Sequence, residues 1–217
     1  MTEIYFVRHG QASFGAENYD KLSTIGHKQS ELLGLHLKKT SLKFDKVICG
    51  KMKRHQETLA EINKNLKLKN IIFDDRLNEL NYQSLEKAYH TKYKTLPPTI
   101  SIEFRDFHQN LITSWASKKL EDLEESYLDF NNRVNCAVDG HAENTKRLLV
   151  ISSGGPTSVL VTRALSLNYA GTADILNFTL NSSYSVFSKL NNAFTLLQYN
   201  CTPHLDLNET IELKTFI

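Results

Sequence analysis

The sequence predicts an α/β protein: a three-layer α/β/α fold with a mostly parallel central sheet and a small helical lid insertion. Short apolar runs that match strands alternate along the chain with segments whose apolar residues recur at helical spacing. The runs are almost continuously apolar, which is typical of parallel strands covered by helices on both faces. The predicted strands of this kind are Ile4–Val7, Lys46–Cys49, Ile71–Phe73 and Leu148–Ile151.

Helices are expected between these strands. Ser23 is a candidate N-cap for a helix whose buried stripe is expected at Ile25, Gln29, Leu32, Leu33, His36 and Leu37. The helix after the second strand has its stripe at Met52, His55, Leu59 and Ile62. Near the C-terminal end, Ser183–Leu190 and Phe194–Tyr199 are predicted to pair as two strands through an Asn191-Asn192 turn.

The alternation of strand and helix breaks down from about Ser84 to Glu125. Within this segment, one amphipathic helix is expected after Pro97-Pro98, with its apolar side at Phe104, Phe107, Leu111 and Trp115. The segment is interpreted as a small helical lid inserted into the α/β core. The expected organisation is therefore a single domain over residues 1–217 with a lid insertion at about 84–125.

Composition narrows the function classes. The 217 residues are 41% hydrophobic and 23% charged, with a net charge of +2, as in ordinary globular proteins. No long Lys/Arg run indicates a nucleic-acid partner, and no apolar run indicates a membrane span. The three cysteines lack metal-ligand spacing, and no secretory leader pattern is present. We expect a cytoplasmic protein with reduced thiols, without a metal or another cofactor.

Three predicted strands end in polar, anion-binding residues. The first ends in Arg8-His9-Gly10, the second is followed by Gly50 to Arg54, and the fourth continues into Ser152 to Gly155. Ligands of open α/β sheets bind beyond the carboxyl ends of the strands. If these strands are neighbours, two guanidinium groups, an imidazole, hydroxyls and a helix N-terminus meet in one pocket.

Such a set of groups is suited to a phosphoryl group. Arg8 and Arg54 have planar guanidinium groups that suit phosphate oxygens. A helix is expected to start at Gly154, and the backbone amides at such a helix start can bind an anion. His9 among them is a candidate nucleophile toward phosphorus, kept neutral by the adjacent guanidinium. Glu79, in the loop after the third strand, is the candidate acid for the leaving group, because a bound phosphate favours a protonated carboxyl nearby.

These residues resemble the motifs of the histidine phosphatase superfamily, in its phosphoglycerate-mutase-like branch, over essentially the whole chain. Arg8-His9-Gly10 is similar to the defining Arg-His-Gly motif, and Leu22-Ser23-Thr24-Ile25-Gly26 to the Leu-Thr-x-x-Gly helix start. Four further segments resemble family motifs in the same chain order: Arg54 with Gln56-Glu57-Thr58, Leu77-Asn78-Glu79 with Leu85-Glu86, Val150 to Gly155, and Asn200 to Leu205.

The resemblance implies that His9 is phosphorylated during turnover, that Arg8 and Arg54 bind the phosphoryl group, and that Glu79 donates the proton. The chain departs from the family pattern at two places. Ser153 stands where the family has its second catalytic histidine, and Gly15 stands where it often has an asparagine. Ser13 or Asn18 is a candidate to contact the phosphate in place of that asparagine.

Ser153 can donate one neutral hydrogen bond, and together with Gly154 it is expected to bind the phosphoryl group. Losing one charge-assisted bond costs about 1.5–3 kcal/mol, or roughly 10- to 150-fold in rate. His55, His108 and His141 are alternatives that would supply an imidazole from another segment. The chain resembles a branch with Arg-His-Gly-Gln-Ala-Ser near its start and Ser-Gly-Gly in this segment, so Ser153 is interpreted as native.

The leading hypothesis is a cofactor-independent phosphomonoesterase that hydrolyses a small phosphorylated metabolite through a phosphohistidine at His9. A phosphoglycerate mutase-like phosphotransferase is an alternative of the same class, but it is disfavoured because the short insert has Arg105 as its only arginine for a second anionic group. A phosphate-binding or regulatory module, weakened in catalysis by Ser153, is an alternative of a different class. A scaffold that binds a partner protein through the aromatic lid is the third. The sequence does not define an oligomeric state.

Overall fold

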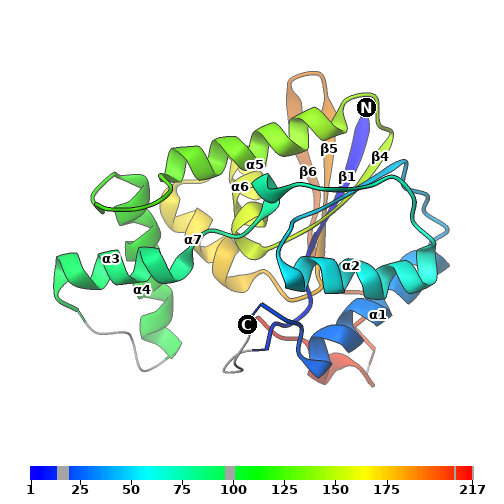
Figure 1. Cartoon of the computed structure of the whole chain (residues 1–217), viewed down its shortest axis with the longest axis horizontal. Coiled ribbons are helices and arrows are strands. Elements are labelled where there is room, and N and C mark those ends of the chain that lie inside the picture. Colours follow the sequence, from blue (N-terminus) through cyan, green and yellow to red (C-terminus); the bar gives the residue numbers. More distant parts are fainter. Residues whose placement is uncertain (14–19, 96–100, 208, 217) are drawn as a thin grey trace.

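The computed structural model describes residues 1–13, 20–95, 101–207 and 209–216, and these form one sheet with helices on both faces (Figure 1). The strands are β1 (Thr2–Arg8), β2 (Lys46–Cys49), β3 (Ile71–Phe73), β4 (Arg147–Ser152), β5 (Tyr184–Leu190) and β6 (Ala193–Cys201). The α-helices are α1 (Thr24–Lys39), α2 (Lys53–Leu66), α3 (Tyr82–Tyr93), α4 (Ser101–Ala116), α5 (Tyr127–Ala142), α6 (Gly154–Leu165) and α7 (Tyr169–Phe178). Short 3₁₀ turns lie at Asp75–Leu77 and Ile211–Leu213.

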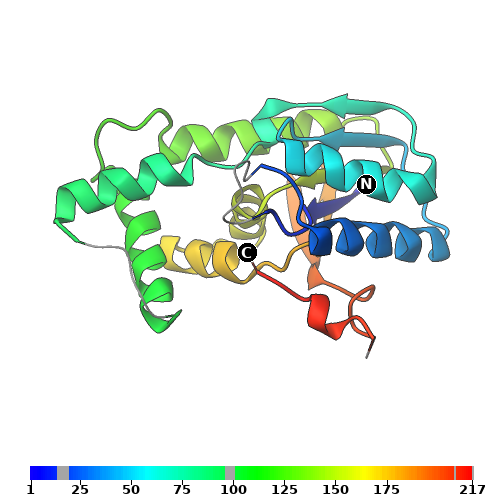
Figure 2. The same cartoon turned by 60° about the horizontal axis from the view of Figure 1, so that its bottom comes forward.

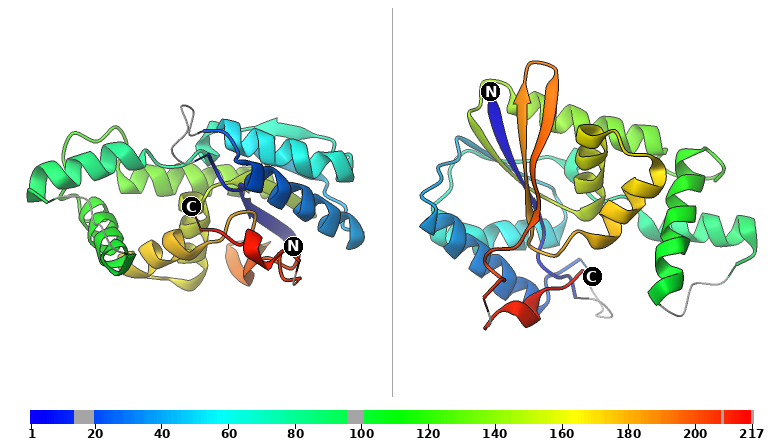
Figure 3. Two further views of the ribbon diagram at one scale, coloured as in Figure 1. Left: turned by 90° about the horizontal axis from the view of Figure 1, so that it is seen from below. Right: turned by 180° about the vertical axis from the view of Figure 1, so that it is seen from behind.

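The strand order is β3-β2-β4-β1-β5-β6. The first four strands in this order are parallel to one another, whereas β5 and β6 are antiparallel. The predicted mostly parallel sheet is therefore confirmed, and so is the hairpin, which lies at one edge of the sheet (Figure 3). Asn191 in its turn has a φ of 52°, a left-handed conformation that asparagine tolerates.

Alternate residues of the strands contribute to two separate cores. Ile4 and Phe6 of β1 belong to the core that α5 and α6 cover, while Val7 belongs to the core that α1 and α2 cover. This alternation follows from the two-residue period of a strand, and it produces the three predicted layers. Helices α1 and α2 lie side by side on their face (Figure 2).

Helix α1 begins where the sequence predicts. The Ser23 hydroxyl accepts a hydrogen bond from the Gly26 amide at 3.0 Å, which is the usual N-cap interaction. Leu33 and Leu37 on this helix are fully buried, as their spacing predicts, whereas Ile25 of the same predicted stripe is 37% exposed. Among the described residues, no helix combines the length and the apolar character needed to cross a bilayer.

The described part of the insertion holds two helices, α3 and α4, whereas only one was predicted from the sequence. Helix α3 was missed because Leu85 is its only buried residue and tyrosines make up much of its inner side, so its apolar periodicity is weak. Helix α4 corresponds to the predicted helix and packs against α7, away from the sheet (Figure 1). The predicted Pro97-Pro98 boundary lies outside the described residues.

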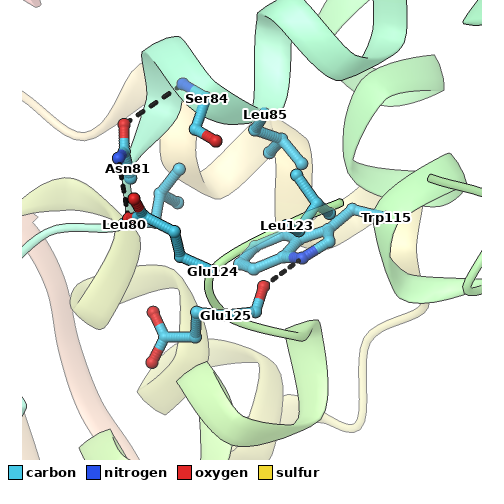
Figure 4. A pocket seen from close by; sticks show the side chains of 8 residues that line it. All are labelled: Leu80, Asn81, Ser84, Leu85, Trp115, Leu123, Glu124 and Glu125. Atoms are coloured by element: carbon cyan, nitrogen blue, oxygen red, sulfur yellow. Dashed lines mark hydrogen bonds between the residues drawn. The ribbon is translucent and has the colours of Figure 1, made fainter. Parts of the chain in front are cut away.

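Trp115 at the end of α4 joins the insertion to the core. Its indole Nε1 donates to the Glu125 carbonyl at 3.1 Å (Figure 4). The centroid of its ring lies 5.6 Å from that of Phe130, which is buried on α5. An aromatic pair of this kind stabilises a contact beyond simple area burial, so the insertion has a fixed attachment to α5.

A pair of leucines on α1 tests the assignment of its buried face. Leu33→Ala should lower the free energy of unfolding by about 2–5 kcal/mol, because it leaves a cavity in the core. Leu35→Ala is the matched control, because Leu35 is 38% exposed. Its effect should stay within about 0.5 kcal/mol in the same urea titration. Equal effects of the two substitutions would contradict the assigned face.

Candidate active site

The three polar strand ends meet at one edge of the sheet. Arg8 at the end of β1 is in register with Ser152 at the end of β4, and the His9 amide donates to the Ser152 carbonyl at 2.9 Å. On the other side of β4, the Gly50 amide donates to the Ile151 carbonyl at 3.0 Å. The expectation that these strands are neighbours is therefore confirmed.

His9 is buried, with 5% of its surface exposed. Its Nδ1 atom lies 2.6 Å from the Gly10 carbonyl oxygen, and its Nε2 atom lies 3.1 Å from the Arg54 Nε atom. A carbonyl oxygen only accepts and a guanidinium only donates, so Nδ1 carries the proton and Nε2 presents its lone pair. The imidazole is thus held with its nucleophilic nitrogen toward Arg54.

Burial and the charges around His9 keep its ring neutral. Burial is the largest cause that holds the pKa of His9 well below its usual range, followed by the positive charges of Arg54 and Arg8. A neutral imidazole is the form that can attack phosphorus, because protonation would occupy the Nε2 lone pair. The notion that the guanidinium groups favour a neutral His9 therefore agrees with the geometry.

The Arg54 side chain is buried in the first turn of α2. Its Nη1 atom donates to the Asp20 Oδ1 atom at 2.6 Å, while the other Asp20 oxygen accepts from the Lys53 amide at 2.8 Å. The Asp20 carboxylate therefore does two things: it holds the Arg54 guanidinium in place, and it accepts a hydrogen bond from the first turn of α2. Asp20 was not predicted from the sequence, because a loop carboxylate that contacts a helix 34 residues away leaves no spacing pattern.

Arg8 lies beside the start of α6. Its Nη1 atom donates to the Thr179 carbonyl, and its Nε atom would be 3.7 Å from a Cβ built on Gly154. The β1 arginine and the α6 N-terminus thus approach each other, as the strand-end pattern predicts. Positive charge and helix amides at one place favour an anion.

Glu79 also reaches the start of α6. Its Oε2 atom accepts from the Gly155 amide at 3.1 Å, and its Oε1 atom accepts from the Leu80 amide at 3.0 Å. A Cβ at position 155 would overlap Oε1, so only glycine leaves room for the carboxyl group. Gly155 is therefore required for the position of Glu79.

Ser153 is fully buried, and its hydroxyl oxygen lies 2.6 Å from the Nε2 atom of His55. The His55 and His9 rings have their centroids 5.6 Å apart. The other two histidines considered as alternatives lie elsewhere: His108 contacts the Tyr82 hydroxyl in the insertion, and His141 bonds Asp74 at 2.9 Å. Of the three alternatives, His55 is the one that these contacts link to the strand-end residues.

Ser13 takes part in closing the loop between β1 and α1. Its hydroxyl donates to the Leu22 carbonyl at 2.9 Å, and its amide donates to the Lys21 carbonyl at 2.8 Å. Because the Ser13 hydroxyl already donates its proton to Leu22, its oxygen can only accept further hydrogen bonds. A phosphate oxygen also accepts, so the two do not match. Asn18, the other candidate, and Gly15 lie outside the described residues.

The site is thus built from Arg8, His9, Arg54, Glu79, Ser153 and Gly154, with Asp20 and His55 added by the structure. Two guanidinium groups, a neutral imidazole and a helix start have the charge and the hydrogen-bond donors that suit a phosphoryl group. Within the described ranges, no cluster of three or more His, Cys, Asp or Glu side chains has the arrangement of a metal site.

Comparison with known proteins identifies the family of the chain. The sequence model of the histidine phosphatase superfamily (branch 1) matches residues 4–202. The chain therefore belongs to the histidine phosphatase superfamily. A protein named "Probable phosphoglycerate mutase GpmB" from Escherichia coli is 27% identical over 175 residues, covering 77% of this chain and 76% of that protein.

Solved structures share the fold at lower identity. A phosphoserine phosphatase from Entamoeba histolytica, in complex with phosphoserine, superposes with a TM-score of 0.66 at 16% identity, covering 94% of this chain and 100% of that chain. An alpha-ribazole phosphatase from Shigella flexneri gives a TM-score of 0.64 at 17% identity, with 93% and 97% covered. A phosphoglycerate mutase from Bacillus anthracis gives 0.67 at 18% identity, with 94% of each chain covered.

The buried histidines predict how stability depends on pH. Burial holds the pKa of His9 and His55 well below the usual value and lowers the pKa of His204 to about 3. The unfolded chain therefore binds protons below about pH 6.5 that the native chain does not bind. Each of these residues should remove about 1 kcal/mol of stability between about pH 7.5 and about pH 5.5.

Urea titrations at the two pH values measure this loss. His204→Gln is the control variant, because it removes one of these residues and should reduce the loss of stability by about 1 kcal/mol. A free energy of unfolding that stays constant, or that rises as the pH falls, would contradict neutral buried rings.

Proposed function

We propose that the chain is a phosphomonoesterase that hydrolyses a small phosphorylated metabolite of the cytoplasm through a phosphohistidine at His9. The observation that supports it most is the state of the His9 ring. Its proton is on Nδ1, bonded to the Gly10 carbonyl, and its Nε2 lone pair lies against a guanidinium that binds phosphoryl oxygens.

In the first step, Arg8, Arg54, Ser153 and the Gly154 amide bind the phosphoryl oxygens. The Nε2 lone pair of His9 forms a bond to phosphorus while the bond from phosphorus to the leaving oxygen breaks. The leaving oxygen takes the proton of the Glu79 carboxyl group and departs as an alcohol. The guanidinium groups stabilise the charge that spreads over the equatorial oxygens during the transfer.

In the second step, water attacks phosphorus from the side that the alcohol has left. The Glu79 carboxylate takes one proton from this water as the new bond from oxygen to phosphorus forms. The bond from Nε2 to phosphorus breaks, and its electron pair returns to His9. Inorganic phosphate is released, the imidazole is neutral again and Glu79 is again protonated, so the steps use only side chains and water.

A phosphoglycerate mutase-like phosphotransferase is the second candidate, and the name of the Escherichia coli relative favours it. A mutase must hold a second anionic group of its substrate under the lid. Arg105 is the only arginine of the 84–125 insertion, and it forms a two-bond ion pair with Asp174 at 3.0 and 2.9 Å. This engagement of Arg105 supports the phosphatase over the mutase.

The first experiment is steady-state hydrolysis of an aryl phosphate without added metal, by the wild type and by His9→Ala. We expect the activity of the variant to fall to background, because no other group forms the phosphoenzyme. His27→Ala is the matched control, since its ring pairs with Glu61 outside the site, and it should keep wild-type activity.

Hydrolysis at the same rate in wild type and His9→Ala would contradict the mechanism. Background activity in both proteins, together with a higher Tm in inorganic phosphate, would instead favour the binding module. Transfer of phosphate between positions of a phosphoglycerate, faster than its release to water, would favour the phosphotransferase.

The role of Glu79 predicts a dependence on the leaving group. Glu79→Gln should slow the hydrolysis of alkyl phosphates by about 100-fold or more, and that of a p-nitrophenyl ester much less, because nitrophenolate leaves without a proton. Gly155→Ala should give the same pattern by displacing the carboxyl group. An equal loss on both substrate classes would show that Glu79 is not the acid.

A further inference from the structure

His55 occupies a fully buried position between β2 and the start of α6. Its Nε2 atom lies 2.6 Å from the Ser153 Oγ atom, and a Cβ at Gly50 would overlap its Nδ1 atom. Glycine at position 50 therefore leaves the room that the ring occupies. Burial of a complete imidazole at this place has a cost that a simple apolar side chain would avoid.

The contacts of the ring define where its proton lies. Among the described residues, the Nδ1 atom has no hydrogen-bond partner, while Nε2 has Ser153. A buried N–H without an acceptor costs more than a buried lone pair without a donor, so the proton is on Nε2. His55 therefore donates to the Ser153 oxygen, and it remains neutral because burial and the Arg54 charge hold its pKa well below the usual range.

Ser153 is then free to donate its own proton. It is the N-cap residue of α6, yet its hydroxyl makes no capping bond to the helix amides. With His55 donating to the oxygen, the hydroxyl hydrogen is available to an acceptor in the site. Donation into a hydroxyl also polarises it and strengthens the hydrogen bond that it gives.

We propose that His55 is a positioning residue that acts through Ser153, orienting the hydroxyl so that it donates to an oxygen of the phosphoryl group. The inference rests on the proposed phosphatase function and deepens it. The family resemblance puts an imidazole at position 153, whereas this chain supplies the imidazole from α2 and uses the serine as its extension. Ser153 thus acts together with His55, and its presence at this position does not mean that the hydrogen bond to the phosphoryl group is absent.

The position of His55 on α2 supports this reading. It follows Arg54 directly, in the first turn of the helix, so one turn supplies both a guanidinium for the phosphoryl group and the ring that orients Ser153. The two rings of His9 and His55 also lie close together, 5.6 Å between centroids. The charged and titratable groups around His55 are Arg54, whose positive charge helps to lower the pKa of His55, and His9, whose ring lies beside it.

The test uses His55→Leu, Ser153→Ala and the double variant, with kcat and KM for an aryl phosphate and the dissociation constant of orthovanadate. Each single substitution should lower kcat on the order of 10- to 100-fold with a smaller change in KM, because it removes one hydrogen bond to the transferring group. The double variant should be no slower than the worse single variant, because the two residues act as a unit.

His55→Gln is the conservative variant, because its amide can donate from nearly the same place as Nε2. It should recover most of the kcat lost in His55→Leu, whereas a residue that only fills space would show no such difference. A second variant exchanges the two residues, His55→Ser with Ser153→His. It should be faster than Ser153→His alone, in which two imidazoles compete for one space.

A wild-type kcat in His55→Leu, or losses of kcat that multiply in the double variant, would overturn the proposed role of His55. Neither result would contradict the proposed phosphatase function. Failure of the phosphatase gives a different result, namely no His9-dependent hydrolysis by the wild type. Orthovanadate affinity then still reports on the pair. Weaker vanadate binding by both single variants, without a further loss in the double variant, supports it, and unchanged or absent binding overturns it.

Discussion

The pairing of β4 between β1 and β2 is the constraint on which the whole site depends. Because the three strands are parallel and in register, Arg8, Ser152 and Gly50 end at the same edge. Each strand then turns into a loop or helix start that brings its own polar group: an imidazole from β1, a guanidinium from α2 and helix amides from α6. A shift of one strand by a single residue would separate these groups and turn their side chains to the opposite face.

Burial and positive charge act in the same direction on the two imidazoles of the site. For a carboxylate, nearby arginines would oppose the effect of burial, but for histidine both disfavour the charged form. His9 and His55 are therefore neutral donors and acceptors, and their roles follow from where each single proton lies. The positive charge in the site comes from arginines, which keep it at any physiological pH. Asp20 offsets part of that charge at Arg54.

The fold and the meeting of the polar strand ends were predictable from sequence, because the residues that determine them are encoded locally. Apolar runs that stop on Arg8-His9, on Gly50 and on Ser152-Ser153 mark the strand ends, and parallel order brings them together. Asp20 and the contact of His55 with Ser153 were not predictable in this way, since each joins segments far apart in the chain. The spacing of His55 matches the buried stripe of its helix, so packing and function leave the same sequence pattern. Helix α3 was missed for a related reason, because its tyrosines carry little apolar periodicity.

The contact between His55 and Ser153 changes what a departure from a family motif means. A hydrogen bond to a phosphoryl oxygen requires a donor at a given point in space, and any segment that reaches this point can supply it. The Ser153 side chain is shorter than that of a histidine and does not extend as far into the site. However, α2 begins beside it, and Gly50 leaves the volume that the His55 ring needs. Three positions on two strand ends therefore form one unit: glycine at 50, histidine at 55 and serine at 153. Their combination, and not the residue at 153 by itself, is the sequence feature that separates a relocated donor from a lost one.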